Sequence, residues 1–222
     1  YACLQQLNDG SRNILTVEDP VEYAIDGVGQ TQVNSKVGMS FATGLRAILR
    51  QDPDVVMVGE IRDRETAEIA VQASLTGHLV LSTVHTNDAL GAITRLKDMK
   101  VEPFLIASTL RAVIAQRLVR RLCAACREQV PAPPSVASLL GVEPGAPVWE
   151  PKGCPGCGQS GYKGRIGLFE VVTVDETLRR MINAGADEAD MAAHAFRMTP
   201  ALADAARSLV REGVTSPEEA VR

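Results

Sequence analysis

Three apolar runs in this sequence each end on an ionisable side chain, namely Glu18, Glu60 and His85. The runs cover residues 14–17, 55–58 and 79–84. Continuous apolar runs without polar alternation predict strands of a parallel sheet that is covered on both faces. Because ligands of open α/β sheets bind where the strands end, the three side chains should line one crevice. Two carboxylates and an imidazole suit a metal-bound polyphosphate and an attacking water.

Glu60 is the first candidate for metal chemistry. A glycine and an acid after a strand often only open a surface turn, but a strand-terminal acid can also hold Mg²⁺ or orient water, as in the second acidic motif of phosphate-loop NTPases. Arg62 and Arg64 follow directly. They are either solvated charges or residues at a nucleotide or subunit boundary.

Three carboxylates surround Pro20, those of Glu18, Asp19 and Glu22. Acids this close repel one another, which a folded protein tolerates more readily when a cation or proton is shared. The alternative is a solvated acidic loop. Either Glu18 or Glu22 could be the base that polarises water, and the sequence leaves that choice open.

Two histidines bracket the third apolar run. An extended segment between His78 and His85 spans roughly 20 Å, so the two imidazoles cannot share one metal ion. His85, at the carboxyl end, is placed to touch a terminal phosphate. The position of His78 at the amino end favours a structural role.

Four cysteines form two Cys-x-x-Cys pairs, Cys123 with Cys126 and Cys154 with Cys157. Four thiolates fit a tetrahedral zinc ion, and because no ligand position is left for water the zinc should be structural. Two disulfides or a redox pair are the alternatives, which an odd fifth cysteine and a cytoplasmic setting disfavour. The segment between the pairs is rich in proline and is expected to need the metal instead of a core of its own.

A basic stretch containing Arg111, Arg117, Arg120 and Arg121 precedes the first cysteine pair and is expected to be helical. Such a helix could bind nucleic acid or anionic lipid. A net charge of −4 and the lack of interleaved aromatic residues favour a solvated face or a subunit contact instead. The sequence has no apolar stretch long enough to span a bilayer, so a soluble cytoplasmic protein is expected.

Strands that alternate with helices predict a βαβ series with a mostly parallel sheet. Ser40 and Asp63 should cap two of the helices, residues 26–40 should form short antiparallel strands, and residues 168–172 one more strand. Both ends of the sequence suggest a fragment. The phosphate-binding pattern Gly-x-x-x-x-Gly-Lys-[Ser/Thr] does not occur in it, and is expected immediately upstream. This stretch alone is therefore not expected to turn over ATP.

Three segments in order resemble the motifs of secretion ATPases. Residues 13–23 resemble the aspartate box, residues 49–63 the Walker B segment, and residues 76–87 the histidine box. Residues 91–99 and 101–105 look more like the type II secretion branch of the type II/type IV secretion and pilus-assembly superfamily than like its pilus branch.

The resemblance implies a RecA-like P-loop NTPase core with a mostly parallel sheet (residues 1–118), a small tetracysteine zinc-binding subdomain (119–165) and a C-terminal helical subdomain (166–222). It implies a homo-hexamer that uses ATP with Mg²⁺ to drive a pseudopilus, and that reaches the cytoplasmic face of the inner membrane through secretion-platform proteins. A nucleic-acid partner is not expected. Glu60 would be the Walker B acid, Glu22 the catalytic glutamate and His85 the phosphate-sensing histidine. Glu18 remains the alternative base, and Asp19, Arg62 and His78 are candidates for cofactor binding.

Three alternatives stay open. The first is a pilus-assembly ATPase of the same superfamily. The second is a zinc-stapled module that binds nucleic acid, and the third is an inactive RecA-like scaffold that only binds partners.

Overall fold

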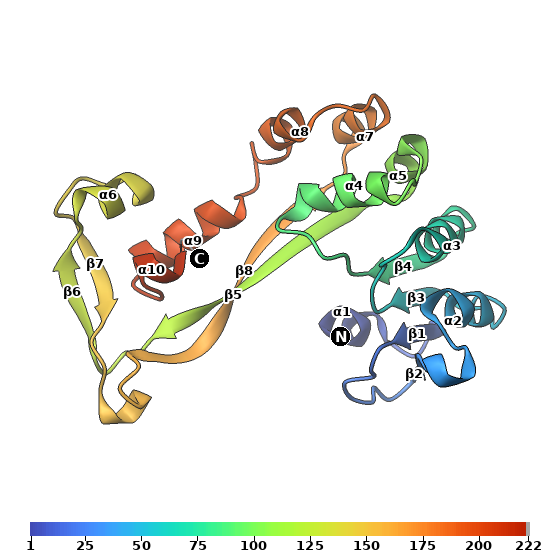
Figure 1. The fold of residues 1–222 in the computed structure, drawn as a ribbon, viewed down its shortest axis with the longest axis horizontal. Coiled ribbons are helices and arrows are strands. Elements are labelled where there is room, and N and C mark those ends of the chain that lie inside the picture. The colour runs from blue at the N-terminus through green and yellow to red at the C-terminus, as the bar shows by residue number, and fades with distance from the viewer. Residues whose placement is uncertain (221–222) are drawn as a thin grey trace. The chain divides into compact units, whose positions relative to one another are not determined.

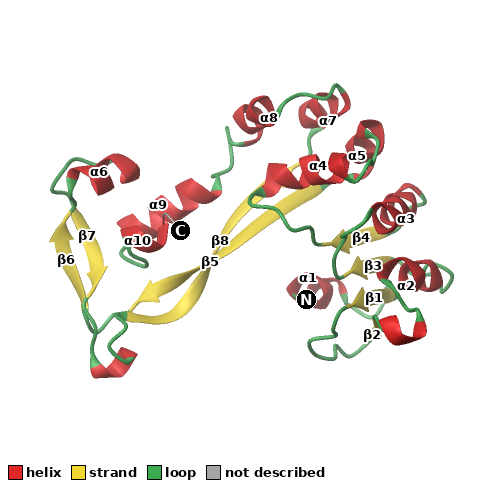
Figure 2. Cartoon of the chain, in the orientation of Figure 1, coloured by secondary structure: helices red, strands yellow, loops and turns green. Residues whose placement is uncertain are grey.

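The computed structural model describes residues 1–220, and the chain divides into two compact units. Unit 1 comprises residues 1–111 and 174–191, and unit 2 comprises residues 112–173 and the segment from Ala192 onward. Figures 1 and 2 show the helices and strands of both units. The three regions expected from the sequence, 1–118, 119–165 and 166–222, stay a prediction about functional subdivision.

Unit 1 contains a four-stranded sheet in which every neighbouring pair of strands is parallel. Its order is β2 (Val28–Gln32), β1 (Ile14–Glu18), β3 (Val55–Val58) and β4 (Leu79–Ser82). The predicted parallel sheet is therefore confirmed. All four strands end at the same edge, which we call the carboxyl edge.

Two helices of unit 1, α2 and α3, begin where the sequence predicts. Ser40 and Asp63 cap α2 and α3 by accepting backbone hydrogen bonds of 3.2 and 2.8 Å, and Asp88 caps α4 in the same way. The helices are α1 (Ala2–Leu7), α2 (Phe41–Ile48), α3 (Arg64–Leu75), α4 (Ala89–Asp98), α5 (Pro103–Thr109) and α7 (Glu176–Asn183), and α8 (Glu188–Ala195) spans the boundary between the units. In the described part of the chain no helix is both long enough and apolar enough to cross a bilayer.

The two faces of the sheet pack on different elements. On one face Ile14 and Val55 form a buried cluster with Leu4 of α1. On the other face Val17 lies against α2 at Gly44, where a Cβ would come within 2.9 Å of a Val17 methyl group. Alternation along β1 thus sends Ile14 and Val17 to opposite faces, which explains why the whole strand is buried.

Two expectations about this sheet are wrong. Within residues 26–40 the main element is β2, which pairs parallel with β1 because the loop after Glu18 carries the chain back to the opposite edge before β2 begins. Only an isolated bridge between Asn34 and Met39 is antiparallel. The third apolar run is not covered on both faces, since β4 is an edge strand of the described sheet and Leu79 is 42% exposed.

Unit 2 is built on two antiparallel strand pairs. The first joins β5 (Ala112–Leu122) to β8 (Tyr162–Thr173), and the second joins β6 (Arg127–Pro131) to β7 (Pro147–Pro151). The helices are α6 (Pro134–Leu140), α9 (Leu202–Arg211) and α10 (Pro217–Ala220). The predicted strand at residues 168–172 is confirmed as part of β8.

The basic stretch that was expected to be helical is β5, so that prediction is wrong. Its valine and isoleucine residues favour extended backbone, and β8 pairs with almost its whole length. Helix α9 covers one face of this ribbon through a cluster of Val119, Leu168 and Ala206. The buried carboxylate of Glu170 accepts the Leu202 backbone N–H at 2.9 Å and caps the start of α9.

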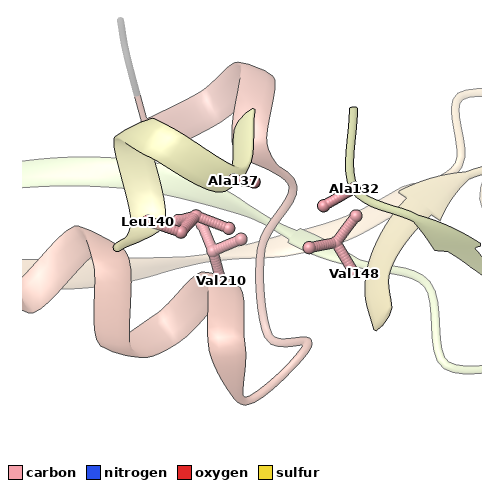
Figure 3. Close-up of a cluster of buried hydrophobic side chains, with 5 residues drawn as sticks. All are labelled: Ala132, Ala137, Leu140, Val148 and Val210. Carbon is pink, nitrogen blue, oxygen red and sulfur yellow. The ribbon is translucent and has the colours of Figure 1, made fainter. Parts of the chain in front are cut away.

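The proline-rich segment does contribute to a core, contrary to expectation. Ala132, Ala137, Leu140 and Val148 form a buried cluster with Val210 of α9 (Figure 3). The segment cannot supply this core alone, because its small side chains need the helix as a partner.

Trp149 and Gly213 lie in tight contact within unit 2. Gly213 has a φ of +69°, and a Cβ there would lie 2.4 Å from the indole ring. The guanidinium of Arg127 stacks 4.4 Å from the centre of the same ring and donates to the Gly213 carbonyl. The single tryptophan of the sequence is thus held by residues distant along the chain.

Candidate functional site

Backbone contacts between strand ends fix the loop that carries Glu60. The Gly59 N–H donates to the Val17 carbonyl at 2.7 Å. The Thr83 hydroxyl donates to the Gly59 carbonyl at 2.7 Å, and the Ile61 N–H donates to the Thr83 carbonyl at 2.9 Å. The loop after β3 is therefore held by the end of β1 and by Thr83, which directly follows β4.

This arrangement brings Glu60 and His85 together. Glu60 is buried, with 9% of its surface exposed, while the side chain of His85 is 84% exposed. His85 Nε2 lies 3.1 Å from Glu60 Oε2, which requires a proton on that nitrogen when the carboxylate is ionised. Arg62 Nε donates to the same carboxylate oxygen. The expected neighbourhood of Glu60 and His85 is present, and their chemical roles stay predictions.

The charges around Glu60 favour its ionised form. The hydrogen bond from Arg62 is the main cause of a lowered Glu60 pKa, and His85 adds to it although burial acts in the opposite direction. The same contact raises the pKa of Arg62, with a smaller contribution from Asp19. The guanidinium thus feels both the Glu60 and Asp19 carboxylates.

We expect Arg62→Gln to raise the pKa of Glu60 towards its ordinary value, because the variant removes the positive charge and its hydrogen bond. Carboxyl chemical shifts measured by NMR as a function of pH would follow this change. A depressed pKa in the folded state contributes stability above the ordinary glutamate pKa, and this stability is lost as the pH falls through the folded value. The unfolding free energies of wild type and variant should therefore differ at neutral pH and converge in acid.

Arg64→Gln is the matched control, because Arg64 pairs with Glu68 on α3 at 2.6 Å. It should leave the Glu60 titration unchanged. An unaltered Glu60 pKa in Arg62→Gln would show that the ion pair does not control this carboxylate.

Glu18 lies at the end of β1 and is only 3% exposed. Its carboxylate accepts hydrogen bonds from Thr16 Oγ1 at 2.6 Å, from Gln30 Nε2 at 3.0 Å and from the Tyr1 hydroxyl. Burial and the bond to Glu18 raise the pKa of Tyr1, so the phenol remains a donor. The Glu18 carboxylate is thus buried inside unit 1 and accepts three side-chain hydrogen bonds.

The other candidates occupy different positions. Asp19 is exposed and lines an open cleft with Gln32 and Lys36. Glu22 is exposed, and its backbone N–H donates to the Tyr1 hydroxyl at 3.0 Å. His78 lies before β4, at the edge opposite Glu60, where its Nδ1 is 3.0 Å from the Ala73 carbonyl and contacts the Thr76 hydroxyl. This position supports a local structural role for His78.

Sequence reasoning missed Tyr1, Thr16 and Gln30. A signal was available for Thr16, since a polar residue two positions before Glu18 shares its strand face in an otherwise apolar run. Nothing local marked Tyr1 or Gln30, which reach Glu18 from other elements.

The four predicted metal ligands form one cluster in unit 2. The Sγ atoms of Cys123, Cys126, Cys154 and Cys157 all lie within 4.8 Å of one another, and all four thiols are free. Cys157 Sγ lies 3.8 Å from that of Cys126 and 3.7 Å from that of Cys154. Zinc–sulfur bonds of about 2.3 Å in a tetrahedron separate the sulfurs by roughly 3.8 Å, so the donor set fits zinc.

Backbone groups also prepare this cluster for metal. Burial raises the pKa of Cys126 to about 12. For Cys157 burial acts the same way, but the N–H groups of Cys154 and Gly161, each 3.2 Å from its sulfur, lower its pKa to about 6. Donors that point at sulfur stabilise a thiolate, which is the form that binds zinc.

A parallel α/β sheet with acids at its carboxyl edge, joined to a tetracysteine module, is the arrangement expected of a secretion ATPase. The family model described as type II/IV secretion system protein matches residues 1–222. The chain therefore belongs to the type II/IV secretion system protein family.

Curated relatives agree with this assignment. The type II secretion system protein E of Pseudomonas aeruginosa is 60% identical over 224 residues, which cover 100% of this chain and 45% of that protein. The type II secretion system ATPase E of Vibrio cholerae is 57% identical over 224 residues, covering 100% and 44%. The chain thus spans less than half the length of these relatives.

The fold also matches a solved structure, that of the pilus retraction motor PilT with bound ADP. The TM-score is 0.72 and the identity 27%, and the match covers 98% of this chain and 54% of PilT. The predicted α/β fold class of this superfamily is confirmed.

Proposed function

We propose that this chain is part of a type II secretion ATPase, a motor that hydrolyses ATP with Mg²⁺ to drive pseudopilus assembly and protein export. The observation that carries the proposal is the Glu60 carboxylate at the carboxyl edge, held by Arg62 and in contact with His85. The relatives named E at up to 60% identity favour the secretion branch over the pilus branch, since PilT is only 27% identical.

The residues at this edge have distinct proposed roles. The other carboxylate oxygen of Glu60, Oε1, would hold Mg²⁺ or its bound water. The exposed imidazole of His85 would contact the terminal phosphate. Glu22 would act as the general base. Magnesium would supply charge neutralisation on the phosphates. The phosphate-cradling loop is not among these 222 residues, so the activity is proposed for the longer protein.

Further proposals concern assembly and the second metal. The motor would work as a homo-hexamer at the cytoplasmic face of the inner membrane, where secretion-platform proteins would recruit it. Cys123, Cys126, Cys154 and Cys157 would hold a structural Zn²⁺ that ties β6 and β7 to the ribbon of β5 and β8.

The test uses the full-length protein that contains this chain. We expect Mg²⁺-dependent release of phosphate from ATP, and restoration of protein export when the gene is returned to a strain that lacks it. ATP turnover without restored export would overturn the assignment to secretion. Salt-sensitive binding to DNA without ATP turnover would support the nucleic-acid module instead.

A further inference from the structure

Glu18 is unsuited to be the base that activates water. A general base needs a lone pair that reaches the water it deprotonates. The Glu18 carboxylate is 3% exposed and already accepts three side-chain hydrogen bonds, from Tyr1, Thr16 and Gln30. Its surroundings are those of a satisfied buried anion.

The partners of Glu18 also bind the acidic loop that follows β1. The Tyr1 hydroxyl accepts the Glu22 N–H at 3.0 Å while it donates to Glu18. Gln30 accepts the Ile25 N–H at 2.7 Å and donates to the Tyr23 carbonyl at 3.2 Å. Three backbone groups of residues 22–25 are therefore hydrogen-bonded to two side chains, Tyr1 and Gln30, that both donate to Glu18.

We propose that Tyr1, Glu18 and Gln30 are positioning residues that hold residues 22–25 and so place the carboxylate of Glu22 for catalysis. This inference rests on the proposed function, in which Glu22 is the base. Glu18 acts as the buried anchor, because its carboxylate orients the Tyr1 hydroxyl and the Gln30 amide that contact the loop. An exposed base on a loop needs such support, since a displacement of about 1 Å can cost roughly 100-fold in rate.

Tyr1→Phe isolates the network with little change in packing. It removes only the hydroxyl, so the edge-on contact of its ring with Tyr23, at 4.6 Å, is preserved. Tyr23→Phe is the matched control, because it deletes a hydroxyl from the other ring of the same pair. Both variants belong in the full-length protein.

The first readout is deuterium uptake by the peptide that contains residues 19–25. We expect exchange in Tyr1→Phe to be roughly 5- to 10-fold faster, as the loss of one net hydrogen bond implies, and exchange in Tyr23→Phe to match wild type. Unchanged exchange in Tyr1→Phe would overturn the network, whether or not the protein hydrolyses ATP.

The second readout is steady-state ATP hydrolysis. Tyr1→Phe should lower kcat by roughly 10- to 100-fold with KM for ATP unchanged. Wild-type kcat despite faster exchange would overturn the positioning role. A wild-type enzyme without ATP turnover would instead overturn the proposed function.

Discussion

Glu60→Gln in the full-length protein should lower ATP turnover by about 100- to 1,000-fold, the usual cost of removing one preorganised electrostatic group from an active site. Glutamine keeps the size of the side chain but carries no charge to hold Mg²⁺ or its water. It also brings an amide N–H₂ group towards Arg62 and His85, which both donate to the carboxylate. Phosphate release at saturating ATP and Mg²⁺ measures the effect.

Glu68→Gln is the control for this variant. Glu68 is a partly exposed acid on α3 that pairs with Arg64, so its neutralisation changes the net charge equally without touching the carboxyl edge. Turnover within about twofold of wild type is expected for the control. The same result for Glu60→Gln would remove Glu60 from the proposed mechanism.

Cys157→Ser should abolish stoichiometric zinc binding and destabilise unit 2. The Sγ of Cys157 lies within 3.8 Å of two other thiols and receives two backbone N–H groups, so it is the best-prepared ligand of the set. A site with free zinc about 1,000-fold above its dissociation constant contributes about 4 kcal/mol. For a unit of this size that loss lowers the melting temperature by roughly 15 to 30 °C.

Metal analysis and the fluorescence of Trp149 together measure this effect. Trp149 lies on β7 and is the only tryptophan among these 222 residues, so in a protein of these residues its emission reports on unit 2. Cys3→Ser is the control, because Cys3 is exposed on α1 in unit 1. Wild-type protein that melts at the same temperature before and after zinc chelation would argue against a structural metal.

The parts of the fold that were predictable have signals within a single segment. The apolar runs of β1 and β3 identified a parallel sheet, and Ser40 and Asp63 marked two helix starts. Failures arose where distant pairing decides the outcome. The basic stretch is β5 because β8 pairs with it, although the two strands are far apart in the sequence.

The site shows the same limit. Parallel strands ending at one edge sufficed to predict that Glu60 and His85 meet. Most of the network around Glu18 was not predictable, because two of its donors come from Tyr1, just before α1, and from Gln30 in β2, and their spacing in the sequence carries no pattern. The cysteine cluster was predictable since ligand type and spacing are themselves the signal.

The contact between Gly213 and Trp149 should couple the residue types that these two positions tolerate. A side chain at position 213 would overlap the indole ring of Trp149. It therefore becomes tolerable only after residue 149 has been replaced by a smaller residue. Even then the positive φ restricts the newcomer mainly to asparagine or aspartate. Among homologous chains a large aromatic residue at position 149 should therefore coincide with glycine at position 213.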